Sequence, residues 1–248
     1  MIIVKITGGL GNQMFQYAAG YAETKKRRTV LKLDLSAYSS GKRRYELGYF
    51  MITAQKANST DILLHKYFLP TTYIHGDFQG EKYFKNSIDA LKQQYTLKNP
   101  ITIQYHDLCT EILSTNSVAV HIRRADYLDK QHRYTILEPT YYMKAMQYIS
   151  AQIAQPKYFF FSDDIDWVKE HITYPADSVF VSDGPYQDRE ELILMSMCKH
   201  QIIANSTFSW WAAWLNKNPE KIVITPTRWF TDAYTQDPDL IPSSWIRI

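Results

Sequence analysis

Hydrophobic residues recur along this chain in two patterns, short apolar runs typical of buried strands and longer stretches with helical spacing. Near the start, an apolar run at residues 2–6 leads into a glycine turn at residues 8–11 and then a helix from about Asn12. The i, i+3, i+4 and i+7 spacing of one buried helix face is met by Phe15, Ala18, Ala19 and Ala22. Further elements predicted in the first half are a strand at 30–35, a helix at 60–67, a strand at 73–78 and a helix at 87–95.

The second half alternates more clearly between strands and helices. Strands are predicted at residues 118–122, 158–161, 179–181, 201–204 and 222–224. Helices are predicted from Pro139 onward and at residues 164–171, 189–198 and 208–216. This alternation indicates parallel α/β sheets. We therefore predict two successive α/β domains, residues 1–115 and 116–248, with the last residues packing on the first domain.

Composition places the chain among ordinary globular proteins, because 45% of its residues are hydrophobic and 21% are charged. No apolar run approaches the ~18 residues that a membrane span needs. The first residues lack the basic lead and cleavage site of a secretory signal. Only Cys109 and Cys198 are present, too few for a disulfide framework or a cysteine zinc site. We therefore expect a cytoplasmic protein.

The net charge of +3 is too small to suggest a nucleic acid partner. Basic residues cluster at positions 25–28 and 42–44. The first cluster is expected to end a helix, where cations offset the helix dipole. Weak peripheral contact with an anionic membrane surface, at the inner face of the membrane, is the alternative that these clusters leave open.

The strand at residues 118–122 continues into two arginines, Arg123 and Arg124, followed closely by Asp126 and Tyr127. Burying an arginine at a strand end is costly unless an anion compensates its charge. A guanidinium binds phosphate through two parallel hydrogen bonds, which favours a phosphorylated ligand. An internal salt bridge, with Asp126 as one partner, is the alternative.

Polar residues also follow the other predicted strands of the second half. In a doubly wound parallel sheet, ligands bind beyond the carboxyl ends of the strands. The residues that collect at this edge are His121, Arg123, Ser162, Asp163, Asp164, Ser182, Asp183, Asn205, Ser206 and Thr207. Each of them alone would also suit a turn or a helix cap. The segment at 205–209 illustrates both options, since its hydroxyls can cap a helix or, with the helix N-terminus, bind phosphate.

Two rival motifs suggest other chemistry. Asp164 and Asp166 form a D-x-D pattern that could hold Mg²⁺ or Mn²⁺ on a nucleotide diphosphate, although Asp164 would equally cap a helix. The turn at Gly9 and Gly11, with Asp34 further on, is similar to the fingerprint of NAD-dependent oxidoreductases. Met14 replaces the third glycine of that fingerprint, and its bulk is expected to force the helix away from the strand.

Four blocks together resemble the bacterial α-1,2-fucosyltransferases of glycosyltransferase family 11. They are Gly-Gly-Leu-Gly-Asn-Gln-Met-Phe-Gln-Tyr at 8–17, His-Ile-Arg-Arg-Ala-Asp-Tyr at 121–127, Phe-Ser-Asp-Asp at 161–164 and Ala-Asn-Ser-Thr-Phe-Ser-Trp-Trp at 204–211. Ala125 stands where that family usually has glycine, and residues 36–115 match less distinctively. The resemblance implies an α/β fold of the GT-B class, with two Rossmann-like domains facing a cleft and GDP-β-L-fucose bound by the C-terminal one.

The resemblance also implies inverting transfer of fucose to the 2-hydroxyl of a terminal galactose, without a metal or other cofactor. It assigns Arg123 to the β-phosphate and His121 to the diphosphate or nucleoside. Ser206, Thr207 and Ser209 are assigned to the phosphate oxygens, and the neighbouring Asn205 to substrate binding. Guanosine contact, or support of the arginines, is assigned to Asp163, Asp164 and Glu191. The turn containing Gly11, Asn12 and Gln13 is similar to one that faces the fucose in protein O-fucosyltransferases, and it places Asn12 in the cleft.

Catalysis should depend most on stabilising charge on the departing GDP, and Arg123 is the leading candidate for that role. Asp126 is the nearest candidate for a general base, unless it simply pairs with Arg124. A non-catalytic glycan-binding module is a further alternative, and it predicts binding without turnover. The galactose-terminated acceptor could be a lactose-like, type 1 or type 2 terminus or a lipid-linked O-antigen intermediate.

Overall fold

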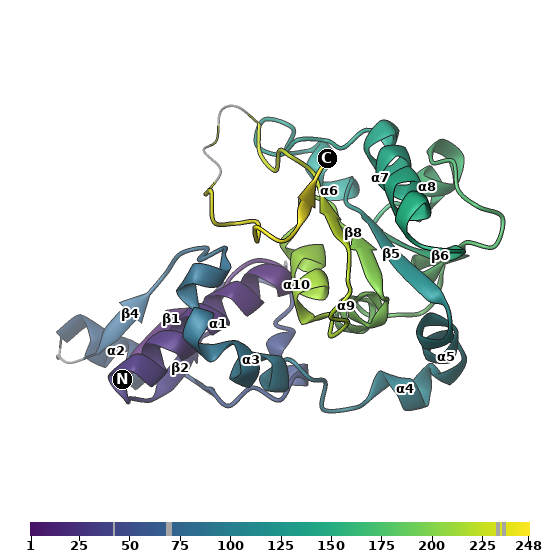
Figure 1. Ribbon diagram of the computed structural model, residues 1–248. Coiled ribbons are helices and arrows are strands. Elements are labelled where there is room, and N and C mark those ends of the chain that lie inside the picture. The colour runs from purple at the N-terminus through teal and green to yellow at the C-terminus, as the bar shows by residue number, and fades with distance from the viewer. Residues whose placement is uncertain (42, 68–70, 232–233, 235–236) are drawn as a thin grey trace. The chain divides into compact units, whose positions relative to one another are not determined.

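The computed structural model describes residues 1–41, 43–67, 71–231, 234 and 237–248 (Figure 1). The chain forms two compact units, unit 1 (Met1–Pro100) and unit 2 (Ile101–Ile248). Each unit is built on a parallel sheet with helices, as the alternating pattern predicted. None of the helices in the described ranges is long and apolar enough to cross a membrane.

Unit 1 contains a four-stranded sheet in the order β3-β2-β1-β4, and all its strand pairs are parallel. Its strands are β1 (Ile2–Lys5), β2 (Leu31–Asp34), β3 (Gln55–Lys56) and β4 (Thr72–Ile74). Its α-helices are α1 (Leu10–Arg27), α2 (Ser59–Tyr67) and α3 (Ile88–Gln94). The predicted strand at 73–78 is wrong beyond Ile74, because the chain turns there and Phe78 takes a positive φ of 51°.

Helix α1 approaches strand β1 closely, and the residue that permits this is Gly20. A Cβ atom on Gly20 would lie 2.3 Å from Cγ2 of Val4. Met14 is fully buried in the core of unit 1. The prediction that Met14 would force the helix away from the strand is therefore wrong, because α1 comes closest to β1 at Gly20, further along the helix. The helix ends, as predicted, in the first basic cluster, with Arg28 as a left-handed C-cap. Lys42, in the second basic cluster, lies outside the described residues.

Unit 2 contains a six-stranded parallel sheet in the order β10-β9-β8-β5-β6-β7. Its strands are β5 (Asn116–Ile122), β6 (Pro156–Ser162), β7 (Val179–Phe180), β8 (His200–Ile202), β9 (Val223–Thr225) and β10 (Ile246–Arg247). Numbered along the chain, the spatial order is 3-2-1-4-5-6, which is that of a Rossmann fold. The order reverses between β5 and β8, so the carboxyl ends of these two strands flank the crevice where such folds bind ligands.

The helices of unit 2 cover both faces of its sheet. They are α4 (Ile101–Gln104), α5 (His106–Ser114), α6 (Ala125–Leu128), α7 (Pro139–Gln152), α8 (Ile165–His171), α9 (Asp188–Met197) and α10 (Thr207–Leu215). Val118, Val120 and Ile122 alternate along β5 and face a core cluster that includes residues of α7. Successive side chains of β5 point to opposite faces, so His121 lies on the other face of the strand.

Two expectations about domain limits differ from this architecture. The predicted boundary falls between residues 115 and 116, whereas the chain divides into its two units between Pro100 and Ile101. Helix α5 packs on β5 and α9, so residues 101–115 belong with unit 2. The last residues, which we expected to pack on the first domain, form β10 and pair in parallel with β9.

Candidate functional site

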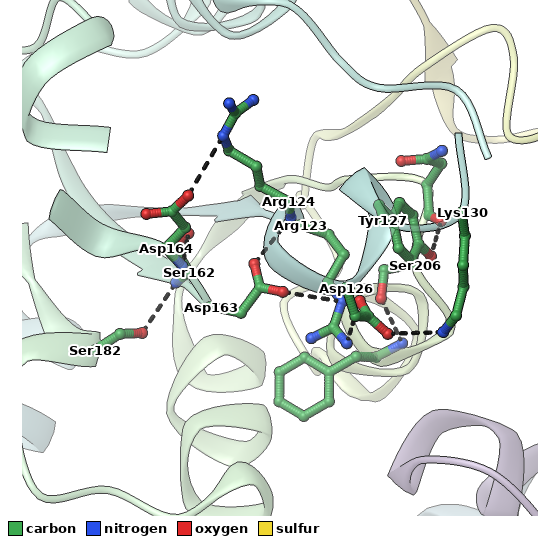
Figure 2. Close-up of polar contacts among 12 residues, drawn as sticks. Arg123, Arg124, Asp126, Tyr127, Lys130, Ser162, Asp163, Asp164, Ser182 and Ser206 are labelled. Carbon is green, nitrogen blue, oxygen red and sulfur yellow. Dashed lines mark hydrogen bonds and ion pairs between the residues drawn. The ribbon is translucent and has the colours of Figure 1, made fainter. Parts of the chain in front are cut away.

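The predicted polar edge of unit 2 forms where β5, β6, β7 and β8 end (Figure 2). Strand β5 leads into Arg123 and Arg124, and the short helix α6 follows. Asp163 and Asp164 follow β6, and Asn205 and Ser206 lie between β8 and α10. The structure therefore brings the arginines and most of their predicted partners to one edge of a single sheet.

Arg123 lies between two carboxylates. Its Nη2 atom is 2.7 Å from Oδ1 of Asp126, and its Nε atom is 3.3 Å from Oδ2 of Asp163. The Arg123 side chain is 25% exposed, so part of it remains open to a ligand. Burial opposes the charged form, but Asp163 and Asp126 outweigh this effect and raise the pKa of Arg123 above its ordinary value. The guanidinium is therefore charged and held in place by its neighbours.

Arg124 points away from Arg123 and binds different partners (Figure 2). Its Nε atom lies 3.3 Å from Oδ2 of Asp164, and its Cζ atom lies 4.3 Å from the centre of the Trp167 ring. The predicted Arg124–Asp126 pair is therefore wrong. Asp126 lies in the first turn of α6, three residues after Arg123, and its carboxylate contacts Arg123 and Lys130.

Asp163 supports both arginines at the end of β6. Its Oδ2 atom contacts the Arg123 side chain, and its Oδ1 atom accepts a 2.8 Å hydrogen bond from the backbone N–H of Arg124. Asp163 and Asp164 thus have the supporting contacts that we predicted for them. A carboxylate that holds a side chain and a backbone together fixes the geometry of the strand end.

His121 is buried beside Arg123, with only 3% of its surface exposed. Burial, and then the positive charge of Arg123, lower the pKa of His121 to about 3. The imidazole is therefore neutral at physiological pH. Its Nδ1 atom is buried without a hydrogen-bond partner among the described residues. The ring lies 5.5 Å from that of Phe208, in the first turn of α10. His121 thus carries an unused polar atom next to both Arg123 and the start of α10.

The ends of β6 and β7 are linked through serine hydroxyls. The backbone N–H of Ser162 donates a 2.9 Å hydrogen bond to Oγ of Ser182, and Oγ of Ser162 accepts one from the N–H of Asp164. Glu191, on α9, is largely buried, and this burial is the main reason that its pKa rises to about 7. The negative charges of Asp188 and Asp163 add to the rise, and a hydrogen bond with Ser182 opposes it. Glu191 therefore lies close to the Asp163 end of the site.

The start of α10 supplies a helix N-terminus at the carboxyl end of β8. Ser206 is the N-cap, and its Oγ atom accepts a 3.3 Å hydrogen bond from the N–H of Phe208. Thr207, the first residue of α10, is partly exposed. The Ser209 hydroxyl is buried and lies within hydrogen-bond distance of the backbone carbonyls of Ala204 and Ser206. Of the predicted phosphate ligands, Thr207 is thus the one with a partly exposed side chain, whereas Ser209 is buried in the protein interior.

Asn205 fastens three segments of unit 2 together. Its Nδ2 atom donates hydrogen bonds to the backbone carbonyls of Thr135 (2.9 Å) and Trp229 (2.7 Å). The backbone carbonyl of Asn205 accepts a 2.9 Å hydrogen bond from the Tyr127 hydroxyl. Asn205 is 1% exposed. Its observed contacts make it a buried brace of the site.

The three predicted residues of unit 1 lie at the turn after β1. Asn12 is in the first turn of α1, and its Oδ1 atom accepts a 3.3 Å hydrogen bond from Nε2 of Gln79. Gln13 is fully buried, donates to the carbonyls of Gly8 and Arg44, and accepts from the N–H of Glu46. Gly11 is also buried. The Asn12 side chain therefore contacts the segment that follows β4. The Gln13 side chain instead holds the loop at residues 44–46.

One carboxylate of each rival motif is engaged within the protein. Asp34 accepts hydrogen bonds from the Tyr73 hydroxyl and the N–H of Ser36. Asp164 is occupied by Arg124, as described above. Within the described ranges, no group of three or more His, Cys, Asp or Glu side chains is placed to hold a metal ion.

Sequence reasoning missed the aromatic residues beside Arg123. The Arg123 Cζ atom lies 5.8 Å from the centre of the Tyr127 ring, and Tyr127 stacks on Tyr134 with ring centres 4.2 Å apart. Arg133 and Phe230 extend this group. Tyr127 could have been noticed, since it stands in the same block as the arginines. Phe230 could not, because it comes from a loop far along the sequence.

Together, the strand order of unit 2 and the charged Arg123 at its switch point define a Rossmann-like α/β protein with a cationic side chain at the edge where such folds bind ligands. Comparison with known proteins identifies the family. The sequence pattern of "Glycosyl transferase family 11" matches residues 27–248, and the chain belongs to this family. The NAD-dependent oxidoreductase alternative is thereby set aside.

The chain is 34% identical to "Alpha-1,2-colitosyltransferase" of Escherichia coli, over 100% of this chain and 99% of that protein. It is 31% identical to "O-antigen biosynthesis glycosyltransferase WbnK" of Escherichia coli, over 98% of this chain and 99% of that one. These similarities make the chain a glycosyltransferase with relatives in O-antigen biosynthesis.

Solved structures support the fold. The NodZ α-1,6-fucosyltransferase soaked with GDP-fucose matches with a TM-score of 0.52 at 14% identity, covering 86% of this chain and 92% of that chain. POFUT1 in complex with GDP-fucose matches with a TM-score of 0.55 at 14% identity, covering 90% and 97%. At such identities the likeness concerns the fold, and it confirms the predicted α/β fold of the GT-B class.

Proposed function

We propose that this protein transfers L-fucose from GDP-β-L-fucose to the 2-hydroxyl of a terminal galactose, with inversion at the anomeric carbon. The observation that carries the proposal is the charged, partly exposed Arg123 at the switch point of unit 2. Further support comes from the names of the relatives, which include "Galactoside alpha-(1,2)-fucosyltransferase 1" of Pan troglodytes, 25% identical over 84% of this chain.

In this proposal the GDP diphosphate lies at the crevice between the ends of β5 and β8. Arg123 contacts the β-phosphate through its guanidinium, which matches phosphate oxygens in a planar fork. The backbone N–H groups at the start of α10, with Thr207, contact the same diphosphate from the other side. His121, neutral and with an unused Nδ1 atom, binds the diphosphate or the nucleoside. Asp163, Asp164 and Glu191 support the arginines or contact guanosine.

The reaction is a single displacement. The bond from the galactose 2-oxygen to the fucose anomeric carbon forms while the bond from that carbon to the β-phosphate oxygen breaks, and GDP leaves with the electron pair. Negative charge grows on the phosphate in the transition state, and Arg123 stabilises it there. The proton of the galactose hydroxyl passes to Asp126, the general base in this proposal. Gly11, Asn12 and Gln13 belong to unit 1, which we assign to the acceptor side.

We propose that the reaction needs no metal and no other cofactor. Arg123 and the α10 N-terminus supply the positive charge that a divalent ion supplies in other nucleotide-sugar enzymes. Asp164, one half of the D-x-D pattern, is engaged with Arg124, which fits this assignment.

Colitose is a second candidate for the transferred sugar, because a relative with 34% identity over the whole chain is named as a colitosyltransferase. Colitose is L-fucose without its 3-hydroxyl group, so both sugars fit the same displacement. A pocket that hydrogen-bonds the 3-hydroxyl would discriminate strongly against colitose, since colitose leaves that partner unpaired.

The test is a transfer assay with GDP-fucose and GDP-colitose, with and without EDTA, across a panel of galactosides. We expect an α-1,2-linked product on terminal galactose and no loss of rate with EDTA. A different linkage, or abolished activity with EDTA, would overturn the corresponding part of the proposal. Binding of GDP-fucose without turnover would favour the glycan-binding module instead.

A further inference from the structure

Two loops of unit 2 pair with each other next to the Arg123 site. Residues 132–135 and 229–231, here called the loop ribbon, join through an antiparallel bridge between Tyr134 and Phe230. The N–H of Thr231 donates a 3.0 Å hydrogen bond to the carbonyl of Arg133. The Thr135 hydroxyl donates a further one, also 3.0 Å, to the carbonyl of Phe230. The ribbon is therefore held by hydrogen bonds between its own two halves, although these are distant in sequence.

The loop ribbon is also fastened to the Arg123 site. Asn205 donates to one carbonyl in each half of the ribbon and accepts from the Tyr127 hydroxyl. The Tyr127 ring stacks on Tyr134 at 4.2 Å and lies 5.8 Å from the Arg123 guanidinium. A row of contacts thus leads from Arg123 through two tyrosine rings to the ribbon.

Arg133 lies among aromatic rings on this ribbon. Its Cζ atom is 5.3 Å from the ring centre of Tyr134, 6.0 Å from that of Phe230 and 5.5 Å from that of Tyr234. No carboxylate in the described part of the chain pairs with it. Tyr234 is 42% exposed. The Arg133 Nε atom is buried without a hydrogen-bond partner in the described part of the chain, so the two Nη groups form the fork that can donate to a partner outside the chain.

We infer that Arg133 and Tyr234 bind the second sugar of the acceptor, the one to which the terminal galactose is attached. A sugar ring has an apolar C–H face and pairs of neighbouring hydroxyls. The exposed Tyr234 ring suits the C–H face, and the Arg133 fork suits a pair of hydroxyls. The inference rests on the proposed function, because the transfer to galactose at Arg123 sets which sugar comes next.

The test compares lactose, which has a second sugar, with methyl β-galactoside, which lacks one. Arg133→Ala and Tyr234→Ala should each raise KM for lactose about tenfold, the loss of about one net hydrogen bond or stacking contact. KM for methyl β-galactoside and the Kd of GDP should stay unchanged. Arg133→Lys keeps the charge without the fork and should fall in between. Tyr148→Ala, at another exposed tyrosine of unit 2, is the matched control and should alter neither substrate.

A purely structural role for Arg133 would raise KM for both acceptors or lower kcat for both, and either result would overturn the inference. Saturation-transfer NMR with lactose and GDP provides a readout that does not need turnover. Wild type should transfer saturation to the glucose ring, and Arg133→Ala should remove that signal while sparing the galactose ring. If the enzyme does not transfer fucose but this NMR pattern appears, the proposed function is wrong and the sugar-binding site is supported. If the enzyme transfers fucose but the pattern is absent, the proposed function is supported and the sugar-binding site is wrong.

Discussion

The guanidinium of Arg123 and the carboxylate of Asp126 form an ion pair, with Nη2 and Oδ1 2.7 Å apart. A phosphate that binds Arg123 must compete with this carboxylate. When the site is empty, the Asp126 carboxylate helps to compensate the charge of the partly buried Arg123 guanidinium. The competition also links the two proposed roles, because phosphate on Arg123 would release Asp126 toward the acceptor hydroxyl.

Replacing Arg123 with lysine should remove most of the transfer activity. Lysine keeps the positive charge but cannot contact phosphate and two carboxylates with one planar group. We expect kcat to fall about 100-fold or more, the usual effect of losing one preorganised donor to a developing negative charge. The measurement is the steady-state rate of GDP release from GDP-fucose in the presence of a galactoside.

The control for this substitution is Arg247→Lys, an exposed position in the same unit. It should keep the wild-type rate. Near-normal turnover by the Arg123→Lys protein would remove Arg123 from the mechanism.

Replacing Asp126 with asparagine should separate donor binding from turnover. The neutral amide competes less well for Arg123, so GDP should bind a few-fold more tightly in a calorimetric titration. Turnover should nevertheless fall by about 10²-fold or more, because asparagine cannot take up the galactose proton. Asp129→Asn, at a neighbouring exposed position, should change neither quantity. Full turnover by Asp126→Asn would show that its carboxylate does not act as the base.

The sequence predicted which polar residues gather at the carboxyl edge of unit 2, because the carboxyl ends of parallel strands lie at one edge of the sheet. His121, Arg123, Asp163, Asp164 and Ser206 all lie there. Which acid pairs with which arginine was not predictable from the strand pattern. Neighbours in sequence diverge at a strand end, and Arg123 meets Asp126 only because a helical turn begins at Ala125.

Other parts of the fold could not be predicted from the sequence, because they depend on tertiary contacts or on very short elements. The boundary at Pro100 depends on α5 packing against β5 and α9, a tertiary contact that no local pattern encodes. Strand β10 has only two residues, too few for an alternating pattern. The loop ribbon joins segments that are distant in sequence, so Arg133 could not be placed beside the site before the structure was known.

Replacing Gly20 with alanine should destabilise unit 1. The added Cβ atom would lie 2.3 Å from Val4, so helix and strand must move apart. Overpacking of this kind costs about 1–3 kcal/mol, more than the helix propensity that alanine gains. Thermal unfolding followed by circular dichroism measures the change.

The matched control is Gly9→Ala, where no atom lies within 4 Å of the added Cβ. Gly9 is the N-cap of α1, where glycine is preferred over alanine, so this change should cost at most about 1 kcal/mol, from the lost cap preference and not from a clash. In a Val4→Ala background the Gly20→Ala change should cost much less, since the clashing methyl is gone. An equal cost in both backgrounds would rule out the steric explanation.

Glu191 should make the stability of unit 2 depend on pH. Burial raises its pKa from an ordinary 4.5 to about 7. Between these values the folded protein binds more protons at this site than the unfolded chain does. The free energy of unfolding therefore falls as pH rises through this window, by an amount on the order of 3 kcal/mol, and levels off above it.

Glu191→Gln stays neutral at every pH, so its stability should fall less than that of wild type between pH 5 and 8. Urea unfolding followed by tryptophan fluorescence reports on unit 2, because all 6 tryptophans lie beyond Pro100. Glu170→Gln, whose side chain is 74% exposed in wild type, should follow the wild-type curve. If the Glu191→Gln and wild-type proteins lose stability in parallel over this range, Glu191 does not titrate there, and its negative charge is stabilised by contacts with the site.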